Sequence, residues 1–112
     1  MSQKYVEMRI YTLKPGTVPG YLKVYQELGM EAQREILGHN LGYFYTEVGA
    51  LNQVIHMWVY NSLEDREARR GKLMKDKRWL EMLPKLREFI VSQETKILIP
   101  APFDPLIADN HS

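Results

Sequence analysis

The sequence contains no cysteine, only three histidines and no long apolar run. A chain without cysteine cannot form a disulfide, a thiolate metal site or a cysteine nucleophile. No segment approaches the roughly 20 consecutive apolar residues that a membrane-spanning helix needs. The first residues also lack the apolar stretch of a signal peptide. These absences predict an intracellular, cytoplasmic domain without a membrane span.

An excess of charge of either sign is also missing. The 112 residues include 15 lysines and arginines against 14 aspartates and glutamates, which argues against a nucleic-acid-binding protein. The charge is nevertheless uneven, because residues 66–87 hold nine basic and three acidic residues, whereas residues 26–65 hold six acidic residues and one basic residue. The basic segment is either a solvated helix face or a surface for a phosphate-rich partner.

Metal and cofactor motifs are absent as well. His39 and His111 fall in a predicted turn and a predicted tail, and no two histidines have the spacing of metal ligands. The sequence has no phosphate-binding loop, no paired dinucleotide glycines and no nucleophile elbow. It therefore predicts neither a metal nor a cofactor.

Hydrophobic periodicity predicts one domain of about 100 residues with the order β-α-β-β-α-β. The predicted elements are a strand over 5–13, a helix from Thr17 to Gly38 with an apolar stripe that includes Leu28, and strands over 41–49 and 53–60. A charged helix then runs from Ser62 to about Lys75, followed by a second short helical piece over 76–89 that Pro84 breaks or kinks, and by a strand over 90–99. This order is typical of the ferredoxin-like α+β fold, a four-stranded antiparallel sheet with both helices on one face. Residues 101–112 form a proline-rich tail that we predict to be extended or disordered.

Side chains alternate between the two faces of each predicted strand. We assign the apolar set Val6, Met8, Ile10 and Phe44 to the face that packs against the helices. The opposite face then carries Glu7, Arg9, Tyr11, Tyr43, Tyr45, Glu47, His56, Trp58 and Tyr60. Exposed to water, this aromatic face would be a large apolar patch, so we expect a second copy to cover it in a homodimeric barrel.

The polar residues of this face are candidates for catalysis. His56, placed near Glu7 or Glu47, could act as a general base, or it could be a structural histidine bonded across the sheet. Arg9 could clamp a carboxylate or phosphate, with Glu7 and Glu47 as orienting groups. Alternatively, Arg9 forms an internal ion pair with Glu47 or Glu94 that maintains the strand register of the barrel.

The aromatic residues of the same face also allow two interpretations. Tyr and Trp side chains line many ligand pockets, and they are also favoured in dimer cores. The residues concerned are Tyr11, Tyr43, Tyr45, Trp58 and Tyr60. A pocket formed by them would lie between the helices and the sheet or inside the barrel.

Three segments of the sequence resemble the NIPSNAP family. They are Glu7-Met8-Arg9-Ile10-Tyr11-Thr12-Leu13-Lys14-Pro15-Gly16, the long run from Gly42 to Tyr60 that continues through Ser62-Leu63 to Arg66 and Arg70, and Ser92-Gln93-Glu94. The resemblance covers residues 5–100 and implies a dimeric α+β barrel of the single-domain bacterial type. Unlike mitochondrial members, this chain shows no targeting segment and no second domain copy.

The family resemblance implies a fold but not an activity. Related barrels include cofactor-free oxygenases, dehydratases and haem-handling proteins, and family members have been linked to vesicle transport and interaction roles. Our first hypothesis is therefore a homodimeric small-molecule binder or cofactor-free enzyme with a semi-polar aromatic pocket. The alternative is a non-catalytic protein-interaction module that uses the dimer and the basic helix as its working surfaces.

Overall fold

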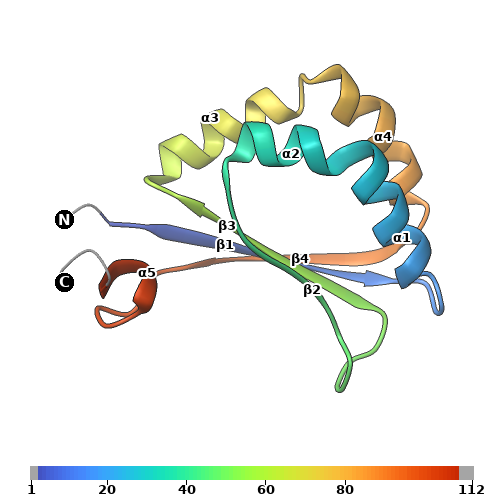
Figure 1. Cartoon of the computed structure of the whole chain (residues 1–112), viewed down its shortest axis with the longest axis horizontal. Coiled ribbons are helices and arrows are strands. Elements are labelled where there is room, and N and C mark those ends of the chain that lie inside the picture. The colour runs from blue at the N-terminus through green and yellow to red at the C-terminus, as the bar shows by residue number, and fades with distance from the viewer. Residues whose placement is uncertain (1–2, 109–112) are drawn as a thin grey trace.

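A computed structural model describes residues 3–108 as an antiparallel sheet with helices on one face (Figure 1). The strand order is β2-β3-β1-β4. Strands β1 (Tyr5–Leu13) and β3 (Gln53–Tyr60) form the centre, and β2 (His39–Tyr45) and β4 (Ile90–Leu98) form the edges. All three strand pairs are antiparallel. The predicted ferredoxin-like α+β fold is confirmed.

The first helical region is not one regular helix. It consists of α1 (Val18–Val24), the π-helix η1 (Tyr25–Gly29) and α2 (Met30–Leu37). A π-helix bonds residue i to i+5, so it takes more residues per turn and shifts the phase of the buried stripe. Leu28, which the regular period predicts to be buried, is therefore exposed, and Gly29 is buried instead.

The second helical region contains α3 (Leu63–Leu73) and α4 (Lys77–Arg87). The side chain of Ser62 caps α3 by accepting a hydrogen bond from the backbone N–H three residues later at 2.9 Å. Helix α4 continues through Pro84, so of the two predicted outcomes, a break or a kink, the break does not occur. Buried side chains on both sides of Pro84 hold the two parts of the helix against the rest of the domain. None of the helices within residues 3–108 is long and apolar enough to cross a membrane.

The helices cover the polar and aromatic face of the sheet, which corrects the predicted assignment of faces. The predicted alternation itself is confirmed, because Glu7 pairs with Trp58 and Arg9 pairs with His56 across the central strands. Glu7, His56 and Trp58 are nevertheless buried beneath the helices, whereas Phe44, predicted to face the helices, is 53 % exposed. Alternation decides which residues share a face. The helices decide which face is covered, and here they supply partners for the polar groups.

The open face of the sheet is the apolar one. Met8, Ile10, Ile55 and Met57 lie on its central strands and are half-buried, and Phe44 extends the face onto β2. Soluble monomers seldom leave a contiguous apolar sheet face uncovered. We therefore expect a second copy to cover this open apolar face, and not the aromatic face as predicted from the sequence.

The chain beyond the sheet includes the one-turn helix α5 (Pro105–Ala108), within the segment that the sequence predicts to be extended or disordered. Figure 1 shows α5 close to the start of β1. Leu106 of α5 and Val59 of β3 border the same surface hollow. Residues 109–112 of the predicted tail, including His111, lie outside the described residues.

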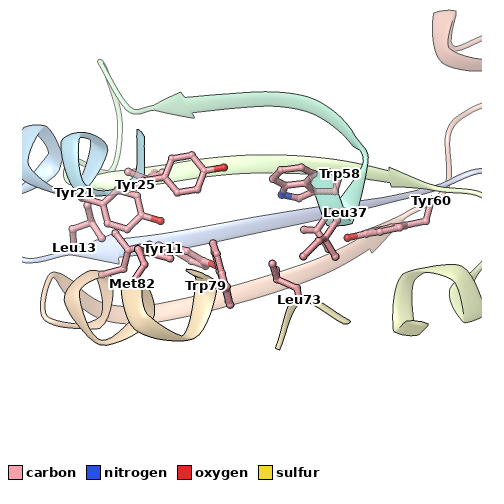
Figure 2. Close-up of a cluster of buried hydrophobic side chains, with 13 residues drawn as sticks. Tyr11, Leu13, Tyr21, Tyr25, Leu37, Trp58, Tyr60, Leu73, Trp79 and Met82 are labelled. Carbon is pink, nitrogen blue, oxygen red and sulfur yellow. The ribbon is translucent and has the colours of Figure 1, made fainter. Parts of the chain in front are cut away.

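The hydrophobic core lies between the helices and the sheet, and Figure 2 shows its labelled side chains in two groups. One group contains Trp58, Leu37, Leu73 and Tyr60. The other lies next to α1 and α4 and contains Leu13, Tyr11, Tyr21, Tyr25, Trp79 and Met82. The second group is rich in phenol hydroxyls, each of which needs a hydrogen-bond partner when buried.

Candidate functional site

His56 lies at the centre of the covered face, and only 1 % of its surface is exposed. Its ring stacks on Tyr43, with 4.6 Å between ring centroids, and meets Tyr11 edge-on at 5.0 Å. These contacts from β1 and β2 hold the imidazole in a single orientation.

The proton on His56 is placed by its neighbour Trp58. The indole Nε1–H of Trp58 donates a hydrogen bond to His56 Nδ1 at 2.7 Å. An indole N–H can only donate, so Nδ1 is the acceptor and the neutral imidazole carries its proton on Nε2. Among the described residues, His56 Nε2 is the one buried side-chain polar atom without a hydrogen-bond partner. The site therefore presents an unused N–H donor.

His56 borders a small cavity between the helices and the sheet. The cavity has about 20 Å³ of room for a water-sized sphere, and its walls include Tyr11, Tyr21, Tyr25, Tyr43 and Trp79. That room suffices for one water molecule. Tyr25 reaches the cavity from the π-helix η1, and such π segments are frequent at functional sites.

The tyrosine hydroxyls around the cavity are paired with one another or with nearby polar groups. The hydroxyls of Tyr21 and Tyr43 lie 2.9 Å apart, and the Tyr25 hydroxyl donates to Gln33 Oε1 at 2.5 Å. Burial, aided by neighbouring tyrosines, raises the pKa of both Tyr21 and Tyr43 far above the usual range. These phenols therefore stay neutral and act as hydrogen-bonding groups rather than as phenolate bases.

Histidine 56 is likewise neutral. Burial, followed by the positive charges of Arg9 and Arg70, lowers the pKa of His56 to about 3. Its Nδ1 is occupied by Trp58 and its Nε2 already carries a proton, so this geometry does not suit the predicted role of proton acceptor. The arrangement instead suits a neutral donor that binds an oxygen acceptor or stabilises negative charge developing on one.

A second polar cluster surrounds Glu7, further along the covered face. Glu7 is fully buried, and its Oε2 accepts two hydrogen bonds from Arg66, at 2.6 and 2.9 Å. Arg9 Nη1 lies 3.3 Å from the same oxygen. Arg70 Nη1 lies 3.8 Å from Oε1, which also accepts a 3.4 Å bond from the Tyr60 hydroxyl. We call Glu7 with Arg9, Arg66 and Arg70 the Glu7 cluster.

The cavity and the Glu7 cluster are adjacent. Arg9 stands opposite His56 in the register of β1 and β3, and its Nε donates to the Tyr11 hydroxyl at 3.0 Å. Tyr11 in turn is part of the cavity wall. The structure therefore brings His56, Arg9 and Glu7 together on one face, as the alternation predicts.

Other predicted site residues lie elsewhere. Glu47 is exposed beyond the end of β2, and Tyr45 is 58 % exposed at the last position of that strand. Tyr60 is buried but contributes to the Glu7 cluster rather than to the cavity. Strand β2 ends at Tyr45, before the predicted 41–49 segment is complete, so Glu47 cannot share the strand face of His56.

The helices supply the site residues that the strand pattern missed. Tyr21, Tyr25, Gln33 and Trp79 border the cavity, and Arg66 and Arg70 of α3 bind Glu7. The sequence did contain one signal for these residues, the four-residue spacing that separates Arg66 from Arg70 and Tyr21 from Tyr25. Residues four apart on a helix lie on the same face. Within residues 3–108, no group of three metal-binding side chains lies close enough together to hold a metal ion.

The topology and the site together define a ferredoxin-like α+β domain with an aromatic cavity beneath its helices. The NIPSNAP family model matches residues 6–105 of this chain. The chain belongs to the NIPSNAP family.

Several known proteins share this similarity over most of the chain. A solved NIPSNAP family protein from Agrobacterium tumefaciens is 48 % identical with a TM-score of 0.92, covering 95 % of this chain and 93 % of that one. A second from that organism, described as of unknown function, is 47 % identical with a TM-score of 0.91, covering 94 % and 95 %. The NipSnap homolog of Dictyostelium discoideum is 36 % identical over 94 residues, covering 84 % of this chain and 41 % of that protein.

The chain thus spans about two fifths of the length of the curated relatives it matches. A more distant structural neighbour is a putative antibiotic biosynthesis monooxygenase from Caulobacter crescentus, 10 % identical with a TM-score of 0.66 over 89 % of this chain and 92 % of that one. At that identity the likeness shows the shared fold alone.

Proposed function

We propose that this chain binds a small molecule in the cavity between its helices and sheet, with an oxygen acceptor of the ligand on His56 Nε2. The observation that carries the proposal is the unpartnered N–H, because a buried donor without a partner costs stability unless something satisfies it. The aromatic walls and neutral hydroxyls are typical of small-molecule sites. The even charge balance also favours such a ligand over a nucleic acid.

The size of the cavity limits how a ligand enters. A molecule larger than water fits only if helix side chains that border the cavity, such as Trp79 and Leu83, move aside. The ligand would then contact aromatic rings on its sides and the His56 donor at one end. A carbonyl, enol or phenol oxygen meets that description, and the same donor would stabilise charge on that oxygen if the site performs chemistry.

A matched pair of probes tests this proposal. We expect phenol to bind at least about tenfold more tightly than toluene, because phenol offers an acceptor oxygen to His56 and toluene does not. The measurement is a titration followed by the imidazole NMR signals of His56. In the variant His56→Phe the preference for phenol should disappear, whereas the surface variant Leu80→Ala should retain it. Equal affinities in the wild type, or no saturable binding of either probe, would overturn the proposal and favour the protein-interaction alternative.

We further propose that the working unit is a homodimer joined through the open sheet face. Met8, Ile10, Ile55 and Met57 form a contiguous apolar surface there, and Phe44 projects from the neighbouring strand. Two sheets packed face to face around a twofold axis would remove this surface from water.

Sedimentation at micromolar concentration tests the dimer. The wild type is expected to sediment as a dimer, and Met57→Glu is expected to give a folded monomer, because it places two buried carboxylates across the axis. The control Leu80→Glu adds the same charge to an exposed position on α4, away from the open face, and should remain dimeric. A monomeric wild type would exclude this arrangement.

A further inference from the structure

The Glu7 cluster holds more positive charge than its single carboxylate can balance. Arg9, Arg66 and Arg70 each lie within 4 Å of one of the Glu7 carboxylate oxygens. Three guanidinium groups facing one carboxylate leave an excess of two positive charges. No other acidic residue within the described part of the chain pairs with any of these arginines.

The donors of the cluster are only partly used. Arg66 donates twice to Glu7, and Arg9 divides its bonds between Glu7 and Tyr11. The side chain of Arg70 makes no hydrogen bond to any residue within 3–108, because its 3.8 Å approach to Glu7 is too long for one. Burial and the nearby charge of Arg9 lower the pKa of Arg70, which shows how closely the like charges are crowded.

The cluster is also accessible. The side chains of Arg66 and Arg70 are each 27 % exposed and that of Arg9 is 13 % exposed, whereas Glu7 is completely buried beneath them. The buried carboxylate therefore contacts the arginine side chains from inside, while part of each arginine side chain remains exposed. Arginine side chains held in place in this way can bind the oxygens of a planar carboxylate or of a tetrahedral phosphate.

We propose that the Arg9–Arg66–Arg70 cluster is a binding site for a small oxyanion, either a phosphate or a carboxylate group. Glu7 positions the three arginines, and Arg70 is the residue whose donors the anion engages most. This site does not depend on the His56 cavity, since the anion needs none of the cavity's donors.

Titration with inorganic phosphate and with benzoate tests the site, with binding followed by calorimetry at low ionic strength. We expect saturable binding of one or both anions with a dissociation constant of about 1 mM or below. Arg70→Gln should weaken that binding at least about tenfold, because it removes charge-assisted donors without removing a hydrogen bond to Glu7. Lys72→Gln is the matched control, since it removes one positive charge from an exposed position on the same helix and should weaken binding less than about twofold.

The pattern of results identifies the anion and separates this site from the cavity. Tighter binding of phosphate would indicate a phosphorylated ligand, and tighter binding of benzoate would indicate a carboxylate, and either supports the site. Binding that persists in His56→Phe supports a site separate from the cavity, whereas its loss there would overturn that assignment. Equal weakening by Arg70→Gln and Lys72→Gln, or no saturation by either anion, would show that water alone solvates the arginines and would overturn the proposal.

Discussion

Glu7→Gln is expected to lower the free energy of unfolding by about 3 kcal/mol, which is among the largest effects of any single substitution in this protein. The substitution preserves the shape of the side chain but leaves three guanidinium groups together without a counter-charge. Removing one partner of a buried ion pair costs about 3–5 kcal/mol, and the partial solvent access of the arginines places this case at the lower end. Chemical denaturation of the two proteins measures the difference.

Two further variants give this prediction its controls. Glu67→Gln removes the same charge from an exposed position of α3 and should change stability by less than about 0.5 kcal/mol. The double variant Glu7→Gln with Arg70→Gln should be more stable than Glu7→Gln alone, because it removes one of the uncompensated charges. If the single and double variants were equally stable, charge crowding would not be the cause of the loss.

The second large effect is a loss of stability in mild acid caused by His56. The folded-state pKa of His56 is about 3, whereas an unfolded histidine has a pKa near 6.5. Below pH 6.5 the unfolded chain therefore binds a proton that the folded chain does not, so stability falls as the pH falls. By this linkage the protein should lose roughly 2 kcal/mol between pH 6.5 and pH 5 and more as the pH approaches 3.

Denaturation curves measured across this pH range test the effect. His56→Gln removes the titrating group, so its stability should change little between pH 6.5 and 5. His39→Gln changes an exposed histidine and should keep the loss seen in the wild type. Imidazole NMR of the folded wild type supplies a direct check, since His56 should remain neutral, with Nδ1 unprotonated, down to about pH 4. A folded His56 that becomes protonated near pH 6 would contradict the burial argument.

The sequence predicted the strands better than the helices. The boundaries of β1 and β3 agree with the predicted 5–13 and 53–60 segments, because alternation and turn residues mark both ends of a strand locally. The π-helix η1 escaped prediction, and with it the exposure of Leu28, because a π turn depends on packing that no local pattern shows. Strand β2 was misplaced for a related reason, since as an edge strand it ends where its pairing with β3 ends.

The candidate site shows the same division. Alternation placed Glu7, Arg9 and His56 on one face, and the register of β1 with β3 confirms it. It could not reveal the hydrogen bond from Trp58 that determines the tautomer of His56, because that bond depends on side-chain orientation. Alternation also could not reveal Arg66 and Arg70 as partners of Glu7, because they follow it in the sequence by 59 and 63 positions, respectively.

The sequence by itself determined the absence of disulfides, the βαββαβ order, the residues of the two central strands that share each sheet face, and the resemblance to the NIPSNAP family. Only the tertiary structure decided which face the helices cover. Alternation is a local property of a strand, whereas coverage depends on where the crossovers pass and which helix groups can satisfy buried polar atoms. The helices bring arginines to Glu7 and phenols to the surroundings of His56, so the polar face became the interior and the apolar face was left open.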